Sequence, residues 1–221
     1  MKTLVLGATK GGVGKTTLAA HLAVAATGSR FGPVAVIDLD KQASLTDWHS
    51  QRQAEQPILA DVDGGLRRTL SRLEAAGVGL VVIDCPPGHP ATIATAVAVA
   101  DLLIIPTQSS PTDLRAIGPT VDIAEQSGTP FAFVLNRAIA RTKLVEQAAE
   151  ALKRHGPLAA ILHQRVDFPA AMTDGRTAGE LRRTGKAAAE IAALWRVVEA
   201  RLREDAEVPV SAGDSILEPL S

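Results

Sequence analysis

The stretch that decides the fold is a glycine-rich octapeptide near the amino terminus, Lys10-Gly11-Gly12-Val13-Gly14-Lys15-Thr16-Thr17. It follows an apolar segment at residues 3–8 and precedes a helix-like segment at residues 18–26. A strand, a glycine loop and a helix in this order are the context that a phosphate-binding loop requires. Glycines let consecutive backbone N–H groups curl around an anion, and the following helix directs its positive end to the same place.

Two lysines belong to this loop. In a phosphate loop of this kind, Lys15 is expected at the β- and γ-phosphates and the Thr16 hydroxyl at Mg²⁺. The strict pattern has a glycine five residues before Gly14, where this chain has Thr9, and Lys10 adds a second cation. Two positive side chains are therefore expected where one triphosphate binds.

The loop resembles the deviant Walker A loop of the ParA/MinD family of P-loop ATPases, written KGGxGKT[ST], at every position. The resemblance covers about residues 1–203 and is to the short ParA-type partition ATPases. It implies ATP and Mg²⁺ as cofactors, and an ATP-dependent homodimer in which Lys10 of each subunit reaches the phosphates held by the other. A structural role for Lys10 within its own subunit is the alternative.

Three aspartates follow apolar, β-branched runs. Asp38 and Asp40 end the run at residues 34–40, and Asp84 ends the run that begins at Leu80. Buried parallel strands are continuous apolar runs, and ligands bind beyond their carboxyl ends. We expect Thr16, Asp38 and Asp84 to hold Mg²⁺ through its water shell and Asp40 to orient the attacking water. For any single strand-end aspartate, a helix N-cap or a loop residue is the alternative.

The remaining chain alternates apolar strands with helical segments. Strands are predicted at 102–107, 131–136 and 158–162, and helices at 45–53, 65–76, 91–98, 112–126, 143–155 and 186–203. Such alternation predicts an α/β fold: a mainly parallel twisted sheet with helices on both faces, as in P-loop NTPases. We expect one domain over residues 1–207 and a disordered tail over 208–221, where no period is visible.

Composition excludes several classes of protein. No window reaches the ~18 uncharged apolar residues of a membrane span, and the amino terminus has no signal peptide, so a cytoplasmic protein is expected; the family resemblance implies association with the nucleoid. The end of the chain from Glu204 is acidic, unlike the basic membrane helix of MinD proteins. Cys85 is the only cysteine, which excludes an internal disulfide and a cysteine metal cluster, and we expect it to be a small core residue. The five histidines show no catalytic or metal-binding spacing.

The resemblance also implies a base-binding segment at residues 135–137. Asn136 is the adenine candidate, with Arg137 beside it; a turn asparagine after a strand is the alternative. The full set of expected nucleotide contacts is Gly11, Gly12, Val13, Gly14, Lys15, Thr16, Thr17, Asn136 and Arg137, and the expected catalytic residues are Lys10, Lys15 and Asp40.

Charge is unevenly distributed along the chain. The total is −1, yet residues 137–203 hold 13 Lys/Arg against 7 Asp/Glu. In the last predicted helix the apolar residues follow helical spacing, so the basic side chains must lie on its flanks and outer face. A solvated helix face is the ordinary interpretation, but the family resemblance favours contact with nonspecific DNA. The candidate residues are Arg182, Arg183, Lys186, Arg196, Arg201 and Arg203.

These observations predict a ParA-type ATP hydrolase that is slow without a stimulating partner, such as a ParB-like protein, and that partitions or positions DNA. Three alternatives stay open on the residues alone. They are an accessory factor for conjugative or T-DNA transfer, a positioning ATPase for a protein cargo, and a metabolic P-loop enzyme.

Overall fold

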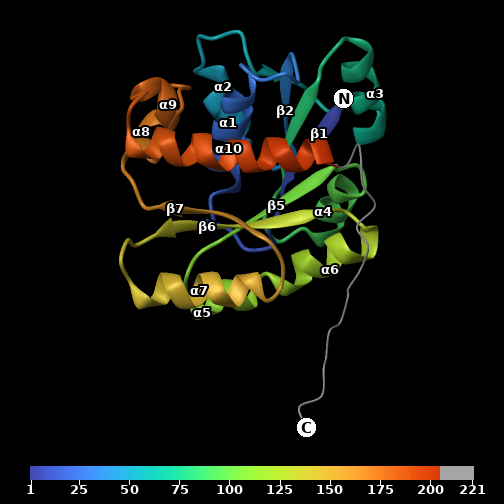
Figure 1. Cartoon of the computed structure of the whole chain (residues 1–221). Coiled ribbons are helices and arrows are strands. Elements are labelled where there is room, and N and C mark those ends of the chain that lie inside the picture. Colours follow the sequence, from blue (N-terminus) through green and yellow to red (C-terminus); the bar gives the residue numbers. More distant parts are fainter. Residues whose placement is uncertain (205–221) are drawn as a thin grey trace.

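A seven-stranded parallel sheet organises the chain (Figure 1). The computed structural model describes residues 1–204. The strands run in the spatial order β3-β2-β4-β1-β5-β6-β7. Their bounds are β1 Lys2–Leu6, β2 Val34–Asp38, β3 Ile58–Leu59, β4 Leu80–Asp84, β5 Leu102–Thr107, β6 Phe131–Ala138 and β7 Leu158–His163. The predicted α/β architecture is confirmed.

Ten helices are distributed over both faces of this sheet in the described residues. Figure 1 shows α8, α9 and α10 beside α1 and α2, whereas α5, α6 and α7 lie together on the other side. The bounds are α1 Lys15–Ala26, α2 Ser44–Ser50, α3 Leu66–Ala75, α4 Pro90–Val97, α5 Pro111–Arg115, α6 Gly118–Ser127, α7 Lys143–Lys153, α8 Asp167–Met172, α9 Ala178–Leu181 and α10 Lys186–Glu204.

Side-chain alternation along the strands creates two hydrophobic clusters. In β1, Leu4 and Leu6 contribute to the cluster under α1 and α10, and Val5 contributes to the cluster on the opposite face. Successive strand residues point to opposite faces, so a parallel strand covered on both sides must be apolar throughout. This explains why the strands of this chain are unbroken apolar runs.

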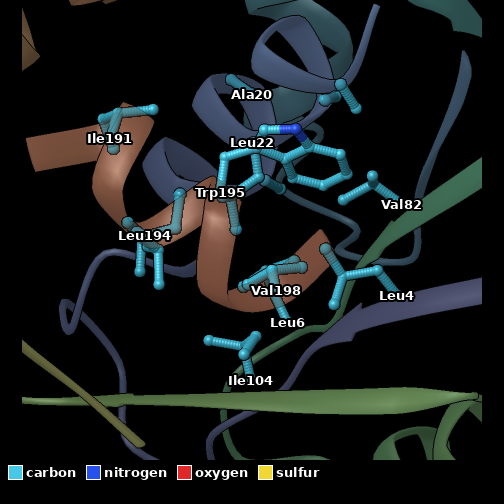
Figure 2. Packing of buried hydrophobic residues seen from close by; sticks show 14 of the residues in the cluster. Leu4, Leu6, Ala20, Leu22, Val82, Ile104, Ile191, Leu194, Trp195 and Val198 are labelled. Carbon is cyan, nitrogen blue, oxygen red and sulfur yellow. The ribbon is translucent and has the colours of Figure 1, made fainter. Parts of the chain in front are cut away.

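The last helix packs by the apolar face that its sequence predicts. Figure 2 shows Ile191, Leu194, Trp195 and Val198 in one cluster with labelled residues of β1, β4, β5 and α1. All four side chains are buried, and so is Leu202 one turn later. The basic residues of α10 are consequently left at its flanks and outer surface.

The structure corrects the predicted elements in several places. The helix predicted at 45–53 ends at Ser50, and the strand predicted at 131–136 extends to Ala138. The helix predicted at 112–126 is two helices, α5 and α6, because Pro119 has no backbone N–H to continue a helix from α5. The short elements β3, α8 and α9 were not predicted. The first helix begins at Lys15, three residues earlier than expected. The predicted tail at 208–221 lies outside the described residues.

Candidate functional site

The glycine loop joins the carboxyl end of β1 to α1 at the centre of the sheet. Gly12 and Gly14 have φ values of +75° and +97°, in the left-handed region that favours glycine. A Cβ at Gly14 would lie 2.3 Å from the Asn136 Nδ2 atom, so this position also lacks room for a side chain. The loop therefore presents backbone N–H groups and the amino terminus of a 12-residue helix to one place, which suits an anion.

Lys15 is buried at the base of this loop. Its residue surface is 6% exposed, and its ammonium group donates a hydrogen bond to the Lys10 carbonyl oxygen at 3.2 Å. Burial lowers the pKa of Lys15 below its ordinary value, although the charges of Asp84 and Asp40 act in the opposite direction. A phosphate group at the loop would supply the negative charge that favours the ammonium form.

Asp84 lies at the end of β4, next to the loop. The Thr16 hydroxyl donates to Asp84 Oδ2 at 2.5 Å, while Asp84 Oδ1 is buried without a hydrogen-bond partner in the described residues. Burial raises the pKa of Asp84 to about 7, and the neighbouring Asp38 and Asp40 add to the effect. A cation bound here would favour the ionised form and satisfy the unpaired oxygen.

Asp38 and Asp40 occupy the end of β2 and the turn after it. Both Asp38 oxygens accept hydrogen bonds: Oδ1 from the Asp40 N–H at 3.0 Å, and Oδ2 from the N–H groups of Leu45 and Thr46 at 3.0 Å each. Asp38 thus binds the amino terminus of α2 from the end of β2, although the N-cap residue of this helix is Ala43. A magnesium role for Asp38 stays a prediction, as does water orientation by Asp40.

The donor set fits magnesium by its chemistry. The Thr16 hydroxyl and the carboxylates of Asp38 and Asp84 are hard oxygen ligands, and one of those oxygens is the unpaired Asp84 Oδ1. Residues 1–204 contain no group of three or more His, Cys, Asp or Glu side chains arranged to hold a metal. Mg²⁺ commonly binds through one or two carboxylates, waters and substrate phosphates, so such a group is not required.

Two cavities meet at the loop. The first, of about 650 Å³, lies between the loop and α2 and is bordered by Gly12, Lys15, Thr16, Asp40 and Trp48. The second, of about 840 Å³, is lined by the segments at the carboxyl ends of β6 and β7. Gly14, Thr17 and Arg137 border both. A triphosphate at the loop could therefore extend a base into the second cavity.

Asn136 borders the second cavity but is already engaged with the loop. Its Nδ2 donates to the Val13 carbonyl oxygen at 2.8 Å, and its Oδ1 accepts from the Arg137 N–H at 2.9 Å. The residue is 7% exposed, and Arg137 has a left-handed φ of 52°. In this structure Asn136 supports the phosphate loop; contact with adenine stays a prediction.

Lys10 forms an ion pair within its own chain. Its ammonium group contacts the carboxylate of Asp113, on α5, whose side chain is 7% exposed; the Ser110 hydroxyl donates to the same carboxylate. Burial opposes ionisation of Asp113, but these contacts hold its pKa below the ordinary value. The Lys10 side chain is 38% exposed, so it lies at the rim of the site. Sequence reasoning did not pair Asp113 with Lys10, because the two residues are 103 positions apart along the chain.

The six predicted DNA contacts lie on and just before α10. None forms an ion pair within the part of the chain that the structure describes. Five are exposed and Arg201 is partly buried. They are therefore accessible to a polyanion, and their DNA contact stays a prediction.

Three further residues lie where sequence reasoning assigned no chemistry. His21, on α1, is buried; its Nδ1 pairs with the Thr17 carbonyl oxygen at 2.7 Å, and its Nε2 accepts from the Ala178 N–H at 3.0 Å. Trp48 and Arg52, on α2 and just after it, bind the segment that precedes α9. The only available signal was the i, i+4 spacing of Thr17 and His21.

Cys85 is buried, as predicted, and burial raises its pKa above the ordinary value. No helix among residues 1–204 is both long and apolar enough to cross a membrane.

The chain is similar to proteins of known family. The family described as CobQ/CobB/MinD/ParA nucleotide binding domain matches residues 4–178. A "Maintenance of carboxysome distribution protein A" from Gloeobacter kilaueensis is 36% identical over 135 residues, which cover 60% of this chain and 62% of that protein. The chain thus matches less than two thirds of that relative's length.

A second protein with the same description, from Halothiobacillus neapolitanus, is 28% identical over 200 residues, covering 85% of this chain and 91% of the relative. Among solved structures, the septum site-determining protein MinD from Pyrococcus horikoshii, complexed with Mg-ADP, has a TM-score of 0.75 at 20% identity. That match covers 94% of this chain and 99% of MinD. At this identity the structural likeness shows the fold.

Proposed function

Because this chain belongs to the CobQ/CobB/MinD/ParA family of nucleotide-binding domains, we propose that it is a ParA-type ATPase whose ATP-bound form is a DNA-binding dimer that positions a large cargo. The observation that carries this proposal is the presence of two lysines at one phosphate loop. Lys15 is buried under the loop, whereas Lys10 is at its rim. One cation suffices for the subunit's own phosphates, so the second is available to another subunit.

The proposed chemistry is phosphoryl transfer from ATP to water. Catalysis of this reaction is mostly positioning and charge stabilisation, and a cation from a second molecule stabilises the transition state in related NTPases. Lys15 neutralises the phosphates of its own subunit, Lys10 those of the partner, and Asp40 orients water. Bound Mg²⁺, held by Thr16, Asp84 and Asp38, supplies additional neutralisation of the phosphates.

The Asp113 contact sets a condition for this dimer. Lys10 must leave the carboxylate of Asp113 before it can reach a second subunit. The pair is only partly screened from water, because the lysine side chain is 38% exposed. Exchange of one anionic partner for a more highly charged triphosphate is then favourable without unfolding of the loop.

Replacement of Lys10 tests the dimer directly. Lys10→Ala should bind ATP as a monomer and lose both ATP-dependent dimerisation and turnover, as followed by sedimentation velocity and phosphate release. Lys41→Ala is the matched control, since it removes an exposed lysine that follows Asp40 and should dimerise normally. A full ATP dimer of the Lys10 variant would instead indicate a single-subunit P-loop enzyme.

DNA binding is proposed from the exposed arginines near α10. Phosphate contacts by arginine and lysine are sequence-tolerant and salt-dependent. Residues 1–204 contain no recognised motif for sequence-specific contact with DNA bases, such as a helix-turn-helix or a zinc finger. A dimer doubles the contacts of one rigid body, which raises affinity by avidity. Binding to an arbitrary duplex should therefore require ATP and weaken steeply with salt.

Charge reversal tests this surface. Replacing Arg182 and Arg183 together with glutamate should abolish DNA binding while ATP binding is unchanged; the same is expected for Arg196 with Arg203. The control replaces Lys153, at the end of α7, and Arg154, directly after it, with glutamate; α7 lies on the other side of the sheet (Figure 1). If the control loses DNA binding to the same extent, net charge and not the α10 surface is responsible.

The cargo divides the proposal into two candidates. The short ParA-type loop favours partition of plasmid or chromosomal DNA with a ParB-like stimulating partner. The two relatives described as carboxysome distribution proteins favour a protein assembly as the cargo. Deletion of the gene in its native cell separates them: loss of DNA inheritance supports the first, and clustering of a protein assembly with normal inheritance supports the second.

A further inference from the structure

The segment between α8 and α10 is bound by side chains from two helices that begin at the nucleotide site. Gly175, Arg176 and Ala178 each give one backbone group to a side chain of α1, of α2 or of the residues just after α2. The same segment continues directly into Arg182 and Arg183, the first two proposed DNA contacts. We call the contacts of Trp48 and Arg52 with residues 175–180 the α2–α9 junction.

Arg52 makes the largest number of contacts at this junction. Its side chain is 4% exposed. Its guanidinium donates to the Gly175 carbonyl oxygen at 2.8 Å and to both carboxylate oxygens of Glu180 at 2.7 and 3.1 Å. Nε donates to the Gln56 carbonyl oxygen at 2.7 Å, and Cζ lies 5.3 Å from the centre of the Trp48 ring. A planar guanidinium satisfies these partners together, which a lysine ammonium cannot do.

Trp48 and His21 bind the neighbouring backbone groups. The Trp48 indole N–H donates to the Arg176 carbonyl oxygen at 2.9 Å. His21 accepts from the Ala178 N–H at 3.0 Å. Glu180 in turn accepts from the N–H and hydroxyl of Thr177, which forms a capping box at the start of α9. The position of α9 is thereby determined by α1 and α2 together.

Both helices start at groups that a nucleotide would contact. The amino terminus of α2 is bound by the Asp38 carboxylate through the N–H groups of Leu45 and Thr46. The α1 helix begins at Lys15, immediately after the glycine loop. A ligand that shifts Asp38 or the loop must therefore also shift the groups that hold residues 175–180.

The backbone leaves little room for adjustment at this junction. Gly175 has a φ of +74°, and a Cβ there would lie 2.4 Å from the Arg52 backbone nitrogen and 2.5 Å from its Cα atom. Such distances are far below van der Waals contact, and backbone atoms cannot move aside as a flexible side chain can. The two segments are consequently in direct contact, with no layer of side chains between them.

We propose that Arg52 is a positioning residue that makes the placement of Arg182 and Arg183 depend on the nucleotide site. The inference rests on the proposed function, because it takes these two arginines as DNA contacts. ATP changes the surroundings of Asp38 and the glycine loop, α2 and α1 carry the change, and the α2–α9 junction transmits it to α9. The DNA-binding surface is then complete only in the ATP-bound protein.

The central test uses Arg52→Lys, with Arg154→Lys as its control. Lysine preserves the positive charge but not the planar hydrogen-bonding contact. If only the charge of residue 52 affected DNA binding, Arg52→Lys would bind DNA like wild type. We expect ATP to raise DNA affinity of wild type and of the control by about 5- to 150-fold, a usual range for coupled sites. Arg52→Lys should bind ATP and dimerise and so keep the gain from avidity, yet its ATP-dependent gain in DNA affinity should be at least about fivefold smaller than that of wild type.

A glycine pair gives a second test that leaves every charged side chain in place. Gly175→Ala should reproduce the reduced gain in DNA affinity from ATP. Gly179→Ala should not, since a Cβ at that position has only the Thr177 hydroxyl, at 4.0 Å, as a neighbour. Glu180→Gln, whose side chain is 32% exposed, weakens the same junction with the smallest change in packing. Glu180→Gln replaces the other variants in this test if thermal melting shows that Arg52→Lys or Gly175→Ala unfolds the protein.

Hydrogen exchange distinguishes failure of this inference from failure of the proposed function. In wild type, ATP should change amide exchange at residues 177–182; in Arg52→Lys it should not. If wild type binds no DNA but shows this exchange difference, the DNA proposal fails and the link through Arg52 stands. Three results would each overturn the inference. ATP could change amide exchange equally in both proteins. Arg52→Lys could show the ATP dependence of DNA binding that wild type shows, or it could fail to form the ATP dimer.

Discussion

Asn136 offers the sharpest distinction between the structure and the sequence-based expectation. Asn136→Leu keeps the side-chain volume roughly constant and removes the hydrogen bond to the Val13 carbonyl oxygen, which is buried with a residue exposure of 1%. Leaving one buried carbonyl unpaired costs about 1–3 kcal/mol. The Arg137 N–H also loses its partner, but Arg137 is exposed and water can replace it.

The expected consequence is a weakened phosphate loop. If the full cost appears in the loop conformation that binds phosphate, nucleotide affinity falls by about 5- to 150-fold, since 1.4 kcal/mol is one factor of ten. If the replacement instead lowers the free energy of unfolding of the whole protein by this amount, the melting temperature falls by roughly 2–12 °C in a protein of this size. Calorimetric titration and thermal melting measure the two quantities on the same sample.

Comparison of two ligands identifies which role Asn136 has. Inorganic tripolyphosphate contains the phosphates but no base. If Asn136 supports the loop, its replacement weakens ATP and tripolyphosphate by the same factor. Gln108→Ala is the control, because its Nε2 donates to the Gly12 carbonyl oxygen at 3.0 Å in a hydrogen bond that is exposed to solvent, where water can substitute. Unchanged tripolyphosphate affinity with weakened ATP would refute loop support and favour adenine contact.

Three further outcomes are expected. Lys15→Ala should bind ATP at least about tenfold more weakly, as charge-assisted contacts contribute roughly 1.5–3 kcal/mol; unchanged calorimetric affinity would contradict the phosphate-loop assignment. Asp40→Ala should bind ATP and form a persistent dimer by light scattering without turnover, and hydrolysis at the wild-type rate would exclude Asp40 as the water-orienting residue. Burial lowers the pKa of His21 to about 4 from 6.5. Between pH 6.5 and pH 4, the imidazole therefore binds a proton in the unfolded chain but not in the folded chain. Stability should therefore fall by up to about 3 kcal/mol as pH drops from 6.5 to 4; His21→Gln should flatten this dependence, the exposed His155→Gln should not, and equal slopes would refute it.

The sequence predicts the fold because its determinants are local. A glycine loop between a strand and a helix is readable over eight residues, and buried parallel strands are continuous apolar runs. The apolar face of α10 follows from helical spacing alone, and Ile191, Leu194 and Trp195 are buried as that spacing predicts. Two-residue β3 carries too little pattern to detect. Pro119 marks the break between α5 and α6 in the sequence, but the helix predicted at 112–126 from apolar spacing did not take this proline into account.

The parts of the site that were missed depend on long-range contacts. Lys10 meets Asp113, and Arg52 meets Glu180 at a separation of 128 residues. No periodicity or motif connects such pairs, since they are brought together only when the helices pack on the sheet.

Binding of an arbitrary DNA duplex in ATP and in ADP tests the central claim most directly. Fluorescence anisotropy with one labelled duplex, at low and at raised salt, measures whether nucleotide state controls the polyanion surface. The account predicts tight binding with ATP at low salt, little binding with ADP, and steep loss as salt rises. Equal binding in both nucleotides, or none in either at low salt, would contradict an ATP-controlled DNA-binding dimer.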